Sequence, residues 1–294
     1  MIDTNLYRSV DFTSVASFTD GAEGPGVDRS GNLYAVNFAR QQTIGRVTPE
    51  GESSIFLELP GGSCGNGIRF DRAGAMYIAD YTNHNVLRVD MAQCARATSL
   101  AERNAAIQLF THEPTMNQPN DLAIMANDIL FASDPNWPGS WGQIWRVDPT
   151  GQVTLLETGM GTTNGIEVSP DELTLYVNET VQQRVWAYDL SPRGEISNKR
   201  LFHQFPDHWL DGMRCDTTGN LYVTRWGKGV IAKLAPNGEL LQEIPLNGQK
   251  CTNIAFGGPD GCTAYVTVAD RGNIETFRVE HPGREWQLAQ RNGS

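Results

Sequence analysis

Short apolar runs alternate with clusters of turn residues along the chain, and the same arrangement recurs. In the clearest copy, an Asn-Gly pair at Asn164 opens a short run, a Ser-Pro-Asp turn reverses the chain, and a second apolar run extends from Leu173 to Val177. Apolar and β-branched runs of this length, separated by a tight turn, predict an antiparallel β-hairpin.

Five other segments repeat this hairpin. The six hairpins open at Glu23, Asn66, Asn120, Asn164, Asp211 and the pair Thr252 and Asn253. Successive openings are 42 to 54 residues apart. Strand-containing repeats of this length predict a β-propeller, in which each repeat forms one blade.

Two more strand-like runs follow most hairpins, which predicts four antiparallel strands per blade. The sixth unit has only the run from Ile274 to Val279 after its hairpin, so it is one strand short. We expect the N-terminal run from Ser14 to Phe18 to supply that strand and to remove an open edge. The prediction is an all-β protein in which residues 1–294 form a single six-bladed β-propeller domain.

Composition restricts the partners and the compartment. The 294 residues carry a formal net charge of −11, so nucleic acid is a poor candidate partner. Five cysteines without a CxxC pair indicate scattered reduced thiols. There is no signal-peptide pattern and no window of 18 apolar residues, so we expect a soluble, cytoplasmic protein that does not bind membranes. The Ala-rich insertion between Asp90 and Gln108 predicts a short helix on the rim, and the sequence leaves its role and the oligomeric state open.

The hairpin openings hold the residues best suited to chemistry. The innermost strands of a propeller line a central channel, so their openings meet at one face. Two of these residues are carboxylates, Glu23 and Asp211, and the others are mostly amides. One Asn-Gly or Asp-Gly pair alone is an ordinary turn, but six polar openings around one axis form an all-oxygen cage. This cage favours one divalent cation, Ca²⁺ before Mg²⁺ or Mn²⁺, with Zn²⁺ as a further alternative.

Four motifs, EGPGVDRSGNLYAVN, QPNDLAI, TNGIEVSPDELTLYVNET and DGMRCDTTGNLYVT, resemble the senescence marker protein, gluconolactonase and luciferin-regenerating-enzyme family. The resemblance covers almost the whole chain and implies a six-bladed propeller with one divalent cation in its channel and, in many members, lactonase activity. It also implies that Glu23, Asn164 and Asp211 bind the cation, and that Asn120 is a fourth ligand or contacts water and substrate. The related diisopropylfluorophosphatases have a similar Glu-Asn-Asn-Asp set, so the ligands alone do not identify the substrate.

Residues around the channel mouth are candidates for binding substrate. Sugar lactonases of the resembled family often have Arg two residues before the Asn of the PND motif. Here that residue is Gln118, which lacks the charge and the forked donor and argues against a sugar-acid lactone. Several Trp residues favour a flatter or more apolar ligand, although Trp in a propeller loop often packs between blades. The predicted substrate-binding residues are Asn117, Gln118, Trp137, His208, Trp209 and Trp226.

The sequence therefore predicts a metal-dependent lactonase, a hydrolase that opens a cyclic ester. The cation would polarise the carbonyl group, and water would attack it. Asp211 and Asn120 are the expected catalytic residues, and the base is either Asp211 or a hydroxide held by the cation. Two alternatives remain. One is a hydrolase of phosphoester or fluorophosphate substrates on the same metal site. The other is a non-enzymatic NHL-like binding propeller with a structural cation. The segment DYTNHNVLRVD supports this alternative, because it resembles the second hairpin of an NHL-type repeat.

Overall fold

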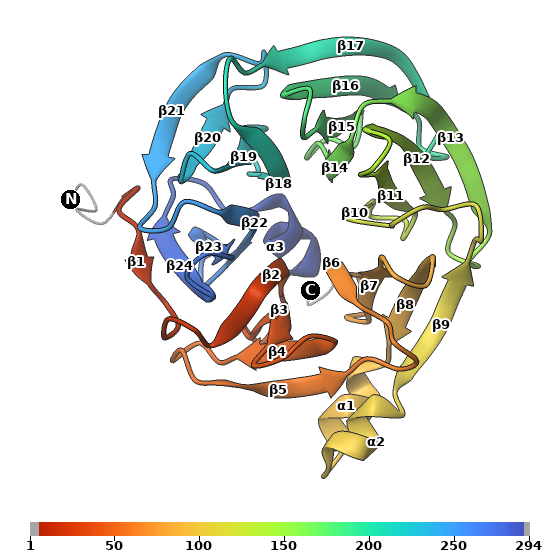
Figure 1. Cartoon of the computed structure of the whole chain (residues 1–294), viewed down its shortest axis with the longest axis vertical. Helices are drawn as coiled ribbons and strands as arrows, with labels where there is room; N and C mark the ends of the chain where they lie inside the picture. Colours follow the sequence, from red (N-terminus) through yellow and green to blue (C-terminus); the bar gives the residue numbers. More distant parts are fainter. Residues whose placement is uncertain (1–5, 291–294) are drawn as a thin grey trace.

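Six antiparallel sheets surround a central axis (Figure 1). The structure is a computed structural model, of which residues 6–290 are described. Each sheet in this part of the chain has four strands. The six-bladed, all-β propeller predicted from the hairpin repeats is therefore confirmed.

The first three blades follow chain order from the axis to the rim (Figure 1). Blade 1 contains β2 (Phe18–Val27), β3 (Leu33–Phe38), β4 (Thr43–Val47) and β5 (Ser53–Glu58). Blade 2 contains β6 (Gly65–Phe70), β7 (Met76–Asp80), β8 (Asn85–Val89) and β9 (Ile107–His112). Blade 3 contains β10 (Leu122–Ile124), β11 (Leu130–Asn136), β12 (Trp141–Val147) and β13 (Val153–Met160).

The fourth and fifth blades have the same order. Blade 4 contains β14 (Thr163–Val168), β15 (Thr174–Glu179), β16 (Arg184–Leu190) and β17 (Ile196–Gln204). Blade 5 contains β18 (Trp209–Cys215), β19 (Leu221–Trp226), β20 (Val230–Leu234) and β21 (Leu240–Pro245).

The sixth blade combines both ends of the chain. It contains β22 (Cys251–Gly257), β23 (Thr263–Val268), β24 (Asn273–Arg278) and the N-terminal β1 (Val10–Asp11). In β1, Val10 lies opposite Thr276 and Asp11 lies opposite Glu275. Closure by an N-terminal strand is thus confirmed. The prediction that the segment from Ser14 to Phe18 forms this strand is wrong.

The position of the closing strand was predicted wrongly for a simple physical reason. Ser14 to Ser17 form a turn in which the amide of Ser17 donates to the carbonyl oxygen of Ser14 at 3.3 Å. Phe18 begins β2 and packs its ring 5.1 Å from that of Phe38. This core side chain produced the apolar signal, whereas Val10 in the true closing strand is 49% exposed and contributes to no apolar run.

The apolar core lies between neighbouring blades. Val36 and Ile44 of blade 1 pack in one cluster with Ile68 and Ile78 of blade 2, and all four side chains are fully buried. Packing apolar sheet faces against each other removes them from water, which is the main favourable term in folding. The axis is therefore left to polar residues of the innermost strands, and even these are enclosed, since every residue of β14 is buried.

Residues 6–290 also contain three short helices. The insertion after Asp90 forms α1 (Met91–Arg96) and α2 (Leu100–Asn104) at the rim, which confirms the expected short helix there (Figure 1). The side chain of Asp90 caps α1 by accepting from the amide of Gln93 at 2.9 Å. The third helix, α3 (Arg284–Gln290), lies near the axis and was not predicted (Figure 1). None of the helices in residues 6–290 is both long and apolar enough to cross a bilayer.

Candidate metal centre

The openings of the innermost strands meet around one cavity at the hub. This hub cavity has a volume of about 410 Å³. Its lining includes one opening residue from each blade: Glu23, Asn66, Asn120, Asn164, Asp211 and Thr252. The structure therefore brings together all four residues that were predicted to bind a cation.

Glycines after the acidic openings allow the innermost strands to approach one another. Gly24 has a φ of +57°, and a Cβ built there would lie 1.8 Å from the backbone oxygen of Asn66. A Cβ on Gly212 would lie 2.0 Å from the side chain of Asn253. Only glycine fits such contacts without displacing the neighbouring strand. The Glu-Gly and Asp-Gly pairs therefore help to bring Glu23 and Asp211 to the axis.

Glu23 and Asp211 face the same cavity as two carboxyl groups with the same charge. Burial raises the pKa of Glu23 to about 8, and the charge of Asp121 adds to this effect. Burial and then the charge of Glu23 raise the pKa of Asp211 well above its ordinary value. Two carboxylates in one enclosed site oppose each other's ionisation. The pair is therefore fully ionised at neutral pH only beside a positive charge.

Several buried oxygens at the hub accept no hydrogen bond from the described part of the chain. Asn164 donates from Nδ2 to Oγ1 of Thr180 at 3.1 Å, while its Oδ1 has no donor. Oε1 of Glu23 and Oδ1 of Asn66 and Asn120 also have none. Buried acceptors normally have partners. Four such oxygens from four blades match the ligand set of a hard divalent cation.

The chemistry of this set distinguishes between cations. Two of the four predicted ligands, Asn120 and Asn164, are amides, and residues 6–290 contain no cluster of three or more His, Cys, Asp and Glu placed to hold a metal. Ca²⁺ accepts amide and carboxylate oxygens readily, whereas Zn²⁺ prefers Cys and His. The hub residues therefore fit Ca²⁺ and other hard cations better than Zn²⁺.

A second layer of charged residues lies next to the candidate ligands. Asp121 directly follows Asn120, and its carboxylate lies 3.2 Å from Nη1 of Arg69 and 3.1 Å from Nη1 of Arg214. Burial acts to raise the pKa of Asp121, but the charges of Arg69 and Arg214 outweigh it and hold the pKa below its ordinary value. Asp121 is therefore ionised, and the two arginines fix the position of the chain beside Asn120.

Helix α3 contributes the other anion of this layer. An oxygen of Glu285 lies 2.9 Å from Nε of Arg69 and 2.8 Å from Nε of Arg214. Glu167 is fully buried nearby, and burial followed by the charge of Glu285 raises the pKa of Glu167 to about 7. Sequence analysis missed this layer. The available signal was an Arg three residues after the openings of the second and fifth hairpins.

The predicted substrate-binding residues separate into two groups. Gln118 and Trp137 line the hub cavity together with the candidate ligands. Asn117 lies beside it, where its backbone amide donates to Asp134 at 2.8 Å and its Oδ1 accepts from Asn136 at 3.2 Å. Among the lining residues that were not predicted, three have side chains that can form hydrogen bonds: Asn37, Gln41 and Tyr81.

His208, Trp209 and Trp226 do not line this cavity. The rings of Trp209 and Trp226 stack with centroids 5.0 Å apart, and Nζ of Lys250 lies 5.3 Å from the Trp226 centroid. Nδ1 of His208 lies 3.4 Å from a carboxylate oxygen of Asp207. These three residues form part of the surface near blade 5, and their contact with substrate stays a prediction.

The fold and the hub together define a class of six-bladed propellers with an oxygen-rich site at the axis. Comparison with known families makes this more specific. The family described as SMP-30/Gluconolactonase/LRE-like region matches residues 21–270, so the chain belongs to this family and the resemblance seen in the motifs is confirmed.

Individual relatives agree with this membership. The gluconolactonase of Zymomonas mobilis subsp. mobilis is 27% identical over 91% of this chain and 82% of its own length. The diisopropyl-fluorophosphatase of Loligo vulgaris is 26% identical over 93% of this chain and 94% of its own length. A regucalcin from Agrobacterium tumefaciens, described as a calcium-binding protein, superposes with a TM-score of 0.76 at 20% identity and covers 91% of this chain and 94% of its own. At that identity the superposition supports the fold alone.

Proposed function

We propose that this protein is a lactonase that depends on one divalent cation, in the first instance Ca²⁺. The observation that carries the proposal is the convergence of four oxygen-bearing side chains on one hub cavity: Glu23, Asn120, Asn164 and Asp211. A gluconolactonase that resembles the chain over most of its length adds support. The substrate is a cyclic ester, and the product is a hydroxy acid.

The four side chains would hold the cation through carboxylate and amide oxygens. Glu23 and Asp211 supply the two negative charges that offset a divalent ion, and the unpaired oxygens of Asn120 and Asn164 supply neutral ligands. When bound, such a cation polarises the carbonyl group of the substrate and stabilises the negative charge that develops on its oxygen.

We assign the proton transfer to Asp211. Its carboxyl group faces the cavity beside Glu23, so it is within the space that substrate and water enter. Asp211 takes a proton from the water whose oxygen attacks the carbonyl carbon. The ring C–O bond then breaks, and the departing oxygen takes this proton back from Asp211 to give the hydroxy acid. A neighbouring cation lowers the pKa of a carboxylate and so makes it a weaker base. Asp211 therefore contributes to proton transfer more through its position beside the water than through its basicity.

Asn120 is the second catalytic residue of the proposal. Its backbone amide donates to the carbonyl oxygen of Ser133 at 2.8 Å, and the next residue, Asp121, is held by Arg69 and Arg214. The backbone that carries the Asn120 side chain is therefore held in place before substrate binds, which reduces the cost of orienting reactants. Its unpaired Oδ1 would help to hold the cation, and the amide group would orient water and substrate.

Gln118 and Trp137 are the residues to which we assign substrate selection. Both line the hub cavity, and neither carries a charge. A neutral amide beside an aromatic surface favours an uncharged lactone with an apolar or flat face over a sugar-acid lactone. A cavity of about 410 Å³ accommodates a small ring compound.

The direct test uses chelator-treated protein and measures acid release from neutral aromatic, alicyclic and sugar-derived lactones. We expect hydrolysis of a neutral lactone to return when Ca²⁺ is added, and to be absent in Asp211→Asn. Cation binding is measured separately by calorimetry. A protein that binds Ca²⁺ at the hub but hydrolyses no lactone in the panel would overturn the lactonase assignment.

One observation favours a second function. The diisopropyl-fluorophosphatase matches 93% of this chain at 26% identity, about as much as the gluconolactonase, which matches 91% at 27% identity. The same four ligands are compatible with hydrolysis at phosphorus. Adding a fluorophosphate and a phosphotriester to the panel separates the two, because a kcat/KM for either above that of every lactone would favour this second function.

A further inference from the structure

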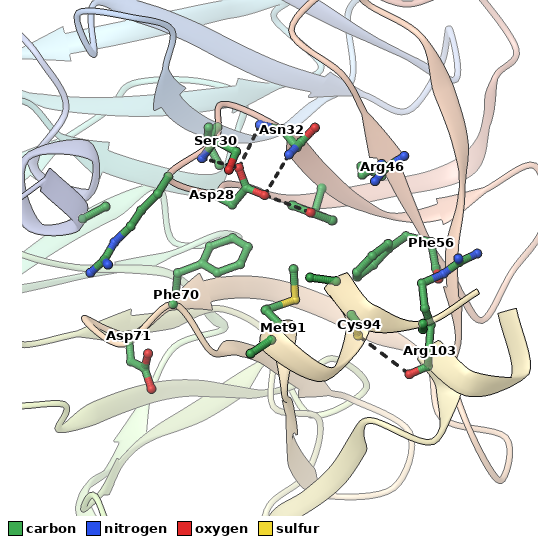
Figure 2. A pocket seen from close by; sticks show the side chains of 18 residues that line it. Asp28, Ser30, Asn32, Arg46, Phe56, Phe70, Asp71, Met91, Cys94 and Arg103 are labelled. Atoms are coloured by element: carbon green, nitrogen blue, oxygen red, sulfur yellow. Dashed lines mark hydrogen bonds between the residues drawn. The ribbon is translucent and has the colours of Figure 1, made fainter. Parts of the chain in front are cut away.

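A second cavity lies between the first two blades, away from the hub. It has a volume of about 470 Å³ and shares no lining residue with the hub cavity. Its walls come from the hairpin turns of blades 1 and 2, from β4 and β5, and from the insertion helices α1 and α2 (Figure 2). The insertion that distinguishes the second repeat thus encloses a space that the blades alone would leave more open.

One side of this inter-blade cavity is apolar. Phe56, Phe70 and Met91 contribute side chains to it (Figure 2). The ring of Tyr34 supports both aromatic residues, with its centroid 4.9 Å from that of Phe56 and 5.7 Å from that of Phe70. An aromatic wall of this kind binds a flat apolar group with little loss of side-chain entropy.

Two guanidinium groups lie on the same side of the cavity as Phe56 (Figure 2). Arg46 comes from β4, and its buried Nε has no hydrogen-bond partner among the described residues. Arg103 comes from α2 and donates from Nε to the carbonyl oxygen of Phe56 at 2.9 Å. Within residues 6–290, neither forms an ion pair with Asp or Glu. Both arginines are half-buried, and with no acidic partner beside the cavity in the described part of the chain their guanidinium groups are available to bind an anion.

The acidic residues of the lining already have partners. Asp28 accepts from the amides of Ser30 at 2.8 Å and Asn32 at 2.9 Å, and from the hydroxyl of Tyr34 at 2.9 Å. Asp71 accepts from the amide of Ala75 at 2.8 Å. Both carboxylates stabilise the hairpin turns in which they lie. They therefore reduce the positive charge of the cavity without neutralising the arginines directly.

We propose that the inter-blade cavity is a second binding site, for a small aromatic monocarboxylate. The carboxylate lies between Arg46 and Arg103, whose planar groups match its two oxygens. The aromatic ring of the ligand packs against Phe56, Phe70 and Met91. An inorganic anion would leave this apolar wall exposed to water, and a neutral aromatic compound would leave both guanidiniums without a counter-charge. An amphipathic anion satisfies both sides of the cavity.

The test is calorimetric titration of the full chain with 3-phenylpropionate in the presence of a chelator, so that neither catalysis nor the hub cation contributes. We expect saturable binding with a Kd below about 1 mM. The neutral amide of the same acid and inorganic phosphate should bind at least about tenfold more weakly. Absence of saturable 3-phenylpropionate binding, or equal binding of the neutral amide, would overturn the proposal.

Two variants and one control locate the site. Arg46→Gln and Arg103→Gln should each weaken 3-phenylpropionate binding by about tenfold or more, and Arg46→Lys, which keeps the charge but loses the fork, should have a smaller effect. Arg40→Gln is the matched control, because Arg40 is exposed and pairs with Glu58 away from the cavity. Thermal unfolding confirms that each variant is folded. Unchanged affinity in folded Arg46→Gln and Arg103→Gln proteins would place the ligand elsewhere and contradict the proposal.

Discussion

Nε of Arg214 lies 2.8 Å from an oxygen of Glu285, so the innermost strand of blade 5 is linked to helix α3. The same oxygen lies 2.9 Å from Nε of Arg69 in blade 2. One carboxylate therefore connects two blades and the C-terminal helix near the axis (Figure 1). Because Arg69 and Arg214 are at most 1% exposed, their charges need nearby carboxylates for compensation. Asp121 and Glu285 contact both arginines, and Glu167 lies 3.9 Å from Nε of Arg214.

Replacing Glu285 should destabilise the propeller. In Glu285→Gln, two buried guanidiniums lose the one carboxylate that contacts both of their Nε atoms, and we expect the free energy of unfolding to fall by about 3 kcal/mol. Asp189→Asn is the control, because Asp189 pairs with Arg200 at 2.6 Å on the surface with both side chains about half exposed. That change should cost less than about 1 kcal/mol. Urea unfolding measures both, and equal losses would contradict a structural role for Glu285.

Removing a hub carboxylate should weaken cation binding. Glu23→Gln and Asp211→Asn each remove one of the two charges at the site, and we expect the Kd for Ca²⁺ to rise about 100-fold or more in each. The exposed Glu239→Gln serves as the control and should bind Ca²⁺ like the unmodified chain. Calorimetry with Ca²⁺ alone makes this measurement independent of any substrate. Retained affinity in both hub variants would place the cation elsewhere.

The stability of cation-free protein should fall as pH rises. The pKa of Glu23 is about 8 in the folded chain against an ordinary value of 4.5, so the folded state keeps a proton that the unfolded state releases between these values. This contribution is complete below about pH 4.5 and is lost as pH rises through about 8. The raised pKa of Asp211 acts in the same direction.

Urea unfolding between pH 5 and 9 with a chelator tests this dependence. Glu23→Gln should make the curve flatter, because the variant side chain does not titrate. Saturating Ca²⁺ should also reduce the loss at high pH, since the cation favours the ionised carboxylates. A curve for the cation-free protein that rises over this range would contradict the assigned burial of Glu23.

Two tryptophans should differ in their effect on substrate binding. Trp137 lines the hub cavity, so Trp137→Ala should raise KM about tenfold with a smaller change in kcat. Trp209 stacks on Trp226 outside the lining, so Trp209→Ala should leave KM nearly unchanged and lower stability by about 1 kcal/mol. If Trp209→Ala raises KM more than Trp137→Ala does, the substrate extends beyond the hub cavity towards blade 5.

Substitution of Gln118 should change substrate preference. Gln118→Arg adds a forked cation to the hub lining, and we expect the ratio of kcat/KM for a sugar-acid lactone to that for a neutral lactone to rise about tenfold. Gln118→Glu is the matched variant of opposite charge and should lower this ratio. Equal ratios in both variants would show that Gln118 does not contact the substrate.

The local pattern of the sequence was sufficient for the repeated hairpins and for the residues at their openings. Turn pairs such as Asn164-Gly165 and Asp211-Gly212 act within a few residues, and β-strand alternation has a period of two. These signals identified six blades and their six polar openings, and the family resemblance then singled out four of those opening residues as candidate ligands. Closure by the N-terminus followed from counting strands, but its position at Val10–Asp11 did not, because exposed edge residues form no apolar run.

Contacts between distant segments were decided only by the tertiary structure. The pairing of Arg69 and Arg214 with Glu285, the separation of Trp209 from the hub cavity, and the inter-blade cavity beside Arg46 all depend on how the blades close around the axis. The local sequence pattern does not indicate which charged side chains, more than 70 residues apart in the chain, form ion pairs. The sequence by itself therefore determined the repeating unit and its polar openings, whereas tertiary packing determined which side chains those openings meet.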